Sequence, residues 1–569
     1  MTVGLVGDGP GAEAVVAALG DADHVVERVE PTELDASYRL GVVVDRAGTR
    51  TFQLANERAL AAGLPWVGVE LGGIGGYPVV DAAVTTFDPA AACYECLVSR
   101  VASNVPEDAD PAEPPSDATA RLAGATAGHR GVALLEDAAD HRGEVVELPH
   151  AERRLLPVPG CDCGDGRDRN LDRSDRERDV EAALARAEQA LDDRLGLVAE
   201  VGEAQSYPAP YYLARLCDTA SFADDTAPRQ AAGVDADWDR AFVKALGEGL
   251  ERYCGGVWRR SEFTTGTAAE VADAVPPSAF VRPNDWASDP DAAERPWVSG
   301  ESLVDGAAVG LPAELVCYPP PERTIRPAVT TGLGLGNATV EALLSGLYEV
   351  LERDATTIAW YSTFEPLGLA VEDEVYRTLA ARAGAEELEE TALLLTQDVD
   401  VPVVAVAVHR EEWPKLALGT AAHLDPERAA RNALAEAVQN WLELREMGAD
   451  ADAADGAITH YADSPSAVDG FVDPDQSVPA ASVGPDSVPA GSAHLDAVVG
   501  RATDAGLAPY AVRTTTRDVE AVGFEAVRVL VPAAQPLFFD DPFFGERARS
   551  VPDAMGFEPA LDRDHHPYP

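Results

Sequence analysis

The sequence has 569 residues, and its 98 acidic side chains against 44 lysines and arginines give a formal net charge of −54. Hydrophobic residues make up 46% of it, which is enough for packed cores and too much for a disordered acidic segment. This charge repels phosphate backbones and anionic lipids, so we expect neither nucleic-acid nor membrane binding. No apolar run approaches the ~18 residues of a membrane helix, and no basic signal-peptide start is present, which predicts a cytoplasmic protein.

Only two of the cations are lysines, Lys244 and Lys415. An acidic surface poor in lysine suits molar salt, where a Debye length of ~3 Å screens self-repulsion. The composition resembles that of haloarchaeal proteins. An acidic protein from a low-salt organism is the alternative.

The chain begins with the pattern of a Rossmann-like α/β unit. A strand is expected at 3–6, a turn at 7–12 that reads G-x-G-x-x-A, and a helix from 13 to 19. Further strands are expected at 40–44 and 65–70. The turn glycines can bind a nucleotide or serve only close strand–helix packing, and both interpretations stay open.

Four of the seven cysteines form two closely spaced pairs, CxxC and CxC. Thiols of a cytosolic protein are kept reduced, so the pairs favour a structural tetrahedral Zn²⁺ site over disulfides. Redox use of the CxxC pair and coincidence are the alternatives. The four residues are Cys93, Cys96, Cys161 and Cys163, whereas Cys217, Cys254 and Cys317 are expected in the core.

These features divide the chain into a front domain at 1–165, a linker at 166–180 and a larger domain at 181–569. The expected class is α/β overall, with α+β architecture in the larger domain. A helix is predicted from 180 to 197, and an acidic Gly/Ala/Pro-rich segment at 449–491 predicts a surface insertion or loop.

Two predicted helices of the larger domain carry carboxylates on one face. Glu248 and Glu251 lie three residues apart on the first helix. At about 100° per residue, four polar residues of the second helix share a narrow stripe: Asn337, Glu341, Glu349 and Glu352. Mg²⁺ accepts such oxygen ligands and bridges carboxylates to phosphates. A solvated acidic face is the alternative, but both helices end in Glu-x-x-Glu-Arg and use Glu where the surface prefers Asp.

The two carboxylate helices resemble the ATP-binding core of YcaO-domain proteins. Three intervening patterns agree, at 297–300, 331–337 and 421–426. The front domain resembles the ThiF-like, E1-related domain of azole-forming cyclodehydratases. The whole chain is therefore similar to the fused ThiF/YcaO cyclodehydratases of thiazole/oxazole-modified microcin biosynthesis, a branch of RiPP and bacteriocin biosynthesis.

The resemblance implies ATP bound through Mg²⁺. A Cys, Ser or Thr side chain would attack the preceding peptide carbonyl, ATP would phosphorylate that oxygen, and phosphate would leave to give a thiazoline or oxazoline. Arg353 would contact phosphate. The implied Mg²⁺ ligands are Glu248, Glu251, Glu341, Glu349 and Glu352, and the implied nucleotide contacts add Asn337, Arg431, Glu436 and Gln439. Arg186 and Arg194 are candidates for a basic residue near the start of the domain.

The chain ends in His-His-Pro-Tyr-Pro. Azoline-forming members end in a proline-rich tail that reaches the active site, and Pro567 and Pro569 match its last two prolines, whereas His565 stands where the first would be. The resemblance thus implies a catalytic tail, and a frayed terminus is the alternative.

The expected substrate is a precursor peptide or protein. A separate leader-recognition protein, a flavin dehydrogenase and a second copy of the chain are candidate partners. Three other functions stay open: a YcaO enzyme that forms peptide thioamides or assists another protein modification, a ThiF-like enzyme that adenylates a carboxyl terminus, and a non-catalytic docking protein.

Overall fold

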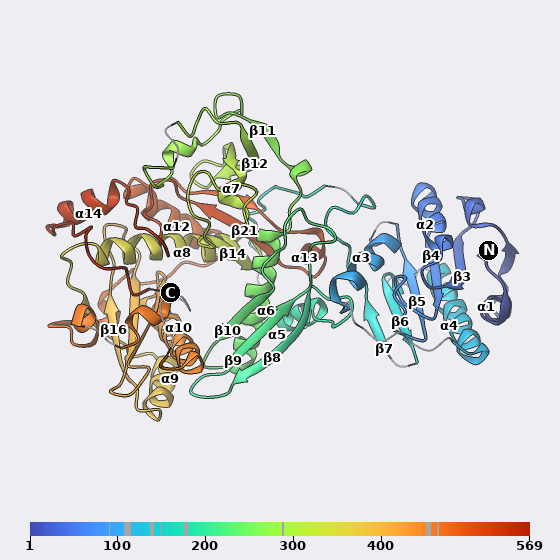
Figure 1. Cartoon of the computed structure of the whole chain (residues 1–569), viewed down its shortest axis with the longest axis horizontal. Helices are drawn as coiled ribbons and strands as arrows, with labels where there is room; N and C mark the ends of the chain where they lie inside the picture. Colours follow the sequence, from blue (N-terminus) through green and yellow to red (C-terminus); the bar gives the residue numbers. More distant parts are fainter. Residues whose placement is uncertain are drawn as a thin grey trace.

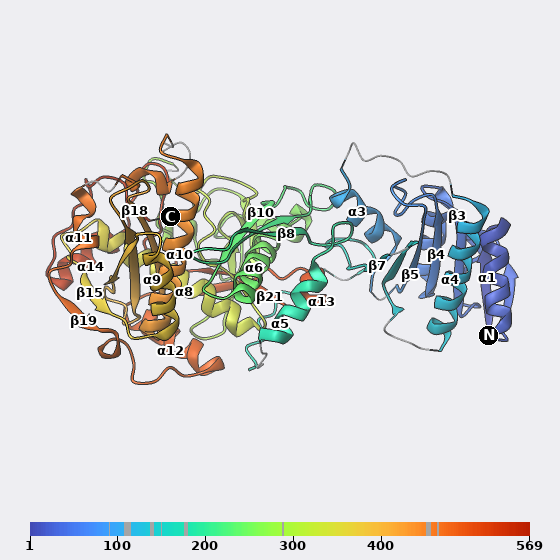
Figure 2. The same ribbon diagram turned by 90° about the horizontal axis from the view of Figure 1, so that it is seen from below.

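The structure is a computed structural model of the whole chain. It describes every residue except 90, 107–114, 137–140, 150, 165, 176–179, 287–288, 451–456, 464–465 and 569. The molecule is elongated, with the N-terminal body at one end and the larger body at the other (Figures 1 and 2). Four sheets and the helices between them make a mixed α/β protein, as expected.

The N-terminal body is a seven-stranded sheet with helices on both faces. Its elements are β1 (Thr2–Val6), α1 (Gly9–Asp21), β2 (Val25–Arg28), β3 (Leu40–Arg46), α2 (Arg50–Ala62), β4 (Trp66–Leu71), β5 (Ala82–Phe87), α3 (Tyr94–Asn104), α4 (Asp117–Leu135), β6 (Glu144–Leu148) and β7 (Ala151–Arg154). Strands β2-β1-β3-β4 are parallel, and β5, β6 and β7 continue the sheet antiparallel. Apolar residues of α1 and α4 pack on one face, and those of α2 and α3 on the other.

The glycines of the first turn serve close packing. Gly7 has a φ of 115°, and a Cβ there would lie 2.1 Å from the carbonyl oxygen of Val44. A Cβ on Gly124 of α4 would lie 2.0 Å from the carbonyl oxygen of Gly11 on α1. Asp8 occupies the N-cap position of α1, but its carboxylate forms an ion pair with Arg28 and no hydrogen bond to the helix. The packing interpretation of the motif therefore fits the structure better than nucleotide binding.

The larger body contains three sheets. A three-stranded sheet consists of β8 (Val198–Gln205), β9 (Tyr211–Leu216) and β10 (Gln230–Val234). A six-stranded sheet contains β11 (Thr264–Gly266), β12 (Arg295–Ser302), β13 (Ala308–Pro312), β14 (Leu333–Gly336), β20 (Tyr510–Arg513) and β21 (Glu525–Leu530). A five-stranded sheet contains β15 (Leu367–Ala370), β16 (Glu389–Leu394), β17 (Val403–His409), β18 (Leu416–Ala422) and β19 (Ser477–Pro479).

Three long helices pack on these sheets. They are α6 (Trp238–Gly256), α8 (Thr339–Trp360) and α10 (Pro426–Met447). α6 packs on β9 and β10, α8 lies between the six- and five-stranded sheets, and α10 covers the other face of the five-stranded sheet. The remaining helices are α5 (Val180–Ala187), α7 (Ala313–Val316), α9 (Glu374–Gly384), α11 (Asp469–Val472), α12 (Gly491–Asp504), α13 (Arg517–Ala521) and α14 (Arg547–Met555). Among the described residues, no helix is both long and apolar enough to cross a membrane.

Two sequence expectations need correction. The helix predicted at 180–197 ends at Ala187, because Asp192 accepts the backbone N–H groups of Arg194 and Leu195 in a turn and Leu191 then bridges to Val198. The described part of 449–491 is not a plain loop, since it contains α11 and the edge strand β19, which pairs parallel with β15.

Candidate active site

Carboxylates from three helices converge at one place in the larger body. Burial raises the pKa of Glu251 to about 8, and the negative charges of Glu349 and Glu248 add to this rise. Burial likewise raises the pKa of Glu352 to about 7 and that of Glu436 above its usual range, with Glu349 contributing to both. The structure therefore brings four of the predicted glutamates of α6 and α8 close to Glu436 of α10, which the resemblance implied as a nucleotide contact.

Each of these helices lies against the edge strand of a different sheet: β10, β14 and β18. A glycine in each strand allows the helix backbone to approach. A Cβ on Gly233 would lie 2.2 Å from the nitrogen of Ala245, one on Gly334 2.2 Å from the oxygen of Ala342, and one on Gly419 2.3 Å from the oxygen of Ala433. Three repeats of this strand–helix contact thus point the edges of three sheets toward the glutamates.

Donors at these three edges hold the carboxylates. The backbone N–H of Ala232 donates to Glu248 at 2.7 Å, that of Gly332 to Glu349 at 2.9 Å and that of Thr420 to Glu436 at 2.6 Å. The Thr420 hydroxyl donates to Glu352. Edge strands leave outward N–H groups without a ladder partner, so the glutamates satisfy them and are fixed in return.

The two arginines of the repeated motif balance part of this charge. Arg252 forms an ion pair with Glu248, and the Nε of Arg353 lies 3.8 Å from Glu352. The positive charge of Arg353 opposes the rise that burial causes in the pKa of Glu352 and of Glu436. Arg528 of β21 was not predicted. It is buried, and burial lowers the pKa of its guanidinium, whereas the negative charges of Glu349 and Glu251 oppose this fall. It lies 168 residues beyond the end of α8 (528 − 360), and no local pattern connects it with that helix.

Asn337 and Glu341 form a separate contact at the start of α8. The backbone N–H and the side-chain amide of Asn337 donate to one Glu341 oxygen at 2.8 and 3.1 Å. Arg186 of α5 donates to the Asn337 side-chain oxygen. Arg194, the other basic candidate, instead pairs with Glu147 of the N-terminal body at 3.1 Å.

The other predicted residues of α10 lie in different surroundings. Gln439 donates a hydrogen bond to Glu443 at 3.0 Å. Burial raises the pKa of Glu248, and the negative charge of Glu443 raises it further. Gln439 therefore lies close to the carboxylate cluster. Arg431 instead lies 3.4 Å from Asp373, the residue that caps α9.

The described part of the C-terminal tail is packed rather than frayed. His566 and Tyr568 are fully buried, and His566 Nε2 lies 2.6 Å from the carbonyl oxygen of Phe538. Burial, together with the charges of His565 and Arg353, lowers the pKa of His566 to about 3. The described tail, which includes Pro567, therefore lies near Arg353. Pro569 lies outside the described residues.

The four paired cysteines meet between α3 and the loop after β7. Their sulfur atoms lie within 4.8 Å of one another; Cys93 is 3.6 Å from Cys161, and Cys96 is 3.5 Å from Cys163. Arg517 of α13 donates to the Cys163 sulfur at 3.4 Å. The cluster therefore lies at the contact between the N-terminal body and the larger body.

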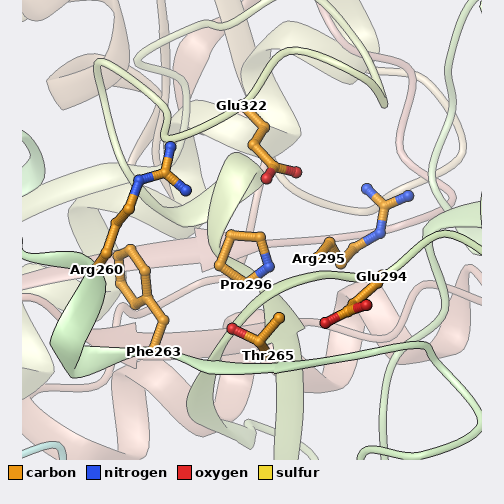
Figure 3. Close-up of a pocket in the computed structure, with 7 residues that line it drawn as sticks. All are labelled: Arg260, Phe263, Thr265, Glu294, Arg295, Pro296 and Glu322. Atoms are coloured by element: carbon orange, nitrogen blue, oxygen red, sulfur yellow. The ribbon is translucent and has the colours of Figure 1, made fainter.

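A cavity of about 300 Å³ lies beside β11 and β12, and it is separate from the carboxylate cluster. Figure 3 shows its lining side chains, with Arg260 and Phe263 on one side, Arg295 and Glu294 on the other, and Glu322 between them at the top. None of the predicted site residues lines it. The candidate site is therefore the carboxylate cluster with Arg353 and the tail.

Comparisons with known proteins show the fold and the family of the chain. A protein of Methanothermobacter thermautotrophicus is 33% identical over 234 residues, which are 38% of this chain and 58% of that protein, so the match spans little more than half of the relative. A solved heterocyclase in complex with substrate and cofactor has a TM-score of 0.73 at 20% identity and covers 98% of this chain and 83% of its own. The YcaO protein of Methanopyrus kandleri, bound with AMPPCP and Mg²⁺, has a TM-score of 0.50 at 24% identity and covers 63% of this chain and 91% of its own.

The solved structures show a shared fold. The family described as "YcaO cyclodehydratase, ATP- and Mg²⁺-binding" matches residues 232–535, more than half of the chain. That span contains α6, α8 and α10 with their glutamates. The chain therefore belongs to the YcaO cyclodehydratase family.

Proposed function

We propose that the protein is an ATP- and Mg²⁺-dependent cyclodehydratase that converts Cys, Ser or Thr residues of a peptide to thiazolines or oxazolines. The observation that carries this proposal is the convergence of carboxylates from three helices beside Arg353 and the buried tail. ATP would phosphorylate the peptide oxygen, and loss of phosphate would complete the ring. Such chemistry needs positioned charge more than covalent help from the protein.

The donor set fits Mg²⁺. At least four half-buried or buried carboxylates face one another, and burial with mutual repulsion raises the pKa of three of them, Glu248, Glu251 and Glu352. Hard divalent cations prefer such oxygen ligands, and bound Mg²⁺ would neutralise phosphate charge. Glu248, Glu251, Glu349 and Glu352 would hold the metal, with Glu436 as a further ligand. Glu341, which accepts hydrogen bonds from Asn337, would bind Mg²⁺ where the N-terminal end of α8 meets the same site.

Arg353 and the tail have distinct roles in this proposal. Arg353 lies beside the glutamates and beside His566, so it would contact the phosphate where the peptide meets ATP. The tail, with Pro567 and Pro569, would close one wall of the site and exclude water. We assign Asn337, Arg431 and Gln439 to nucleotide binding. Arg186 donates to the side chain of Asn337, so we assign it to nucleotide binding as well.

We further propose that residues 1–165 form a ThiF-like domain with a structural Zn²⁺ site, joined by 166–180 to the YcaO domain at 181–569. A tetrahedral ion with Zn–S bonds of about 2.3 Å places its sulfurs about 3.8 Å apart. The closest sulfur pairs here lie 3.5–3.9 Å apart, so the cysteines fit this geometry.

The test uses the full chain in high salt with Mg²⁺, ATP and peptides that contain Cys, Ser or Thr. We expect phosphate release that depends on the peptide, with loss of one water from the peptide per ring by mass spectrometry. Replacement of an oxygen by sulfur would instead indicate thioamide formation. Glu349→Gln should abolish turnover, whereas the exposed Glu294→Gln should not; full turnover by Glu349→Gln would refute the metal assignment.

A further inference from the structure

Glu443 is a carboxylate of α10 that the proposed function does not use. It shares one face of the helix with Glu436 and Gln439, because positions three and seven residues along an α-helix lie within about 60° of the starting residue. Burial raises the pKa of Glu248 on α6, and the negative charge of Glu443 contributes to this rise. Glu443 therefore lies at the edge of the carboxylate cluster.

Two donors hold one oxygen of Glu443. The hydroxyl of Tyr211 on β9 donates to Oε1 at 3.0 Å, and the side-chain amide of Gln439 donates to the same atom at 3.0 Å. Only 4% of Tyr211 is exposed, so packing keeps its ring in place. Glu443 is thereby fixed between α10 and the three-stranded sheet.

This contact fixes the orientation of the Gln439 amide. A carboxylate only accepts hydrogen bonds, so the NH2 group of Gln439 faces Glu443 and the carbonyl oxygen points away from it. Glu436 lies about one turn before Gln439, on the side opposite to Glu443. Among the described residues, no donor bonds to the Gln439 oxygen. Glu443 therefore selects an acceptor rather than a donor at the free end of this amide.

An acceptor suits the site for an electrostatic reason. Burial and mutual repulsion already raise the pKa of Glu251 in the cluster. An amide oxygen can bind Mg²⁺ or accept an N–H or O–H group without adding negative charge, whereas an NH2 group would repel the metal. We propose that Glu443 is a positioning residue, which holds the Gln439 carbonyl oxygen toward bound Mg²⁺ and ATP. This inference rests on the proposed function for the identity of that ligand.

The test measures ligand binding by the full chain in high salt. Glu443→Leu removes the acceptor and should weaken the binding of Mg²⁺ with a non-hydrolysable ATP analogue about tenfold by calorimetry. Glu443→Gln keeps an oxygen for both donors, so it should bind nearly as tightly as the wild type. Glu446→Leu, at an exposed position of the same helix, should bind like the wild type.

A double variant separates positioning from direct contact with the ligand. Because Glu443 acts through Gln439, Glu443→Leu should cause no further loss once Gln439→Leu is present. Equal losses in Glu443→Leu and Glu443→Gln would show that the charge of Glu443 itself acts on the ligand, which would overturn the proposal. Unchanged binding by Glu443→Leu, or a second loss of the same size in the double variant, would overturn it as well.

A titration with Mg²⁺ alone identifies what the Gln439 oxygen contacts. Weaker binding of Mg²⁺ alone by Glu443→Leu indicates a metal ligand, and weaker binding of the analogue only indicates an N–H or O–H group of the nucleotide. A wild type that binds neither would overturn the proposal. If Glu443→Leu weakens analogue binding but the wild type shows no peptide-dependent ATP hydrolysis, the proposed function is refuted and the positioning role stands.

Discussion

The contact between the two bodies contains an ion pair that is wholly buried. Arg100 of α3 pairs with Asp518 of α13, and both side chains have 0% exposure. Asp518 also accepts the Tyr253 hydroxyl at 2.6 Å, and Tyr253 lies two residues after Glu251 on α6. The pair therefore connects the N-terminal body to the helix that carries two of the proposed metal ligands.

We predict that Arg100→Met loosens this contact strongly. Removing one partner of a buried pair costs about 3–5 kcal/mol, because the other charge stays buried. Asp518 would keep its hydrogen bonds from the Tyr253 hydroxyl and the backbone N–H of Val519. Because these bonds still stabilise the carboxylate, we expect a cost near the lower end of this range, about 3 kcal/mol. Local opening of α3 and α13 should then become about a hundredfold more frequent.

Hydrogen–deuterium exchange of peptides from α3 and α13 measures this opening. Arg100→Met combined with Asp518→Leu should restore most of the protection, since no charge is then left buried. Asp8→Asn removes the partner of Arg28 in an exposed pair and should change exchange little. Exchange of Arg100→Met as slow as that of the wild type would refute the reasoning, and so would a double variant as unprotected as the single one.

Three further predictions follow from the tail, the cysteines and the net charge. Buried His566 has a pKa of about 3 in the folded protein, so the stability that is present above the ordinary pKa of 6.5 is lost as the pH falls. The loss at pH 5 is about 2 kcal/mol. The unfolding temperature should therefore fall less from pH 8 to pH 5 in His566→Asn than in the wild type, and an equal fall would contradict this. Cys163→Ser should lose one zinc per chain by metal analysis, whereas Cys217→Ser, a buried thiol outside the cluster, should keep it; zinc retained by Cys163→Ser would be evidence against the site. Lowering KCl from about 1 M to about 0.1 M lengthens the Debye length from ~3 Å to ~10 Å, which strengthens repulsion between the surface charges. A chain of net charge −54 should then unfold at a lower temperature. An unchanged unfolding temperature would count against salt adaptation.

Local periodicity determined which residues of one helix face the site. The stripe of Glu341, Glu349 and Glu352 follows from 3.6 residues per turn. The short spacing within the CxxC and CxC pairs is enough to predict a metal site. These patterns repeat within a few residues, so they can be found before any packing is known. The main carboxylates of the proposed site could therefore be selected from the sequence.

Tertiary packing decided the rest. The surroundings of Glu436, Arg186 and Arg528 depend on three edge strands and their helices meeting at one place, and no local period encodes that meeting. The end of α5 at Ala187 likewise depends on the turn at Asp192 and the bridge from Leu191 to Val198. The sequence specified which groups point to one side of a helix, and only close packing at Gly233, Gly334 and Gly419 brought those sides together.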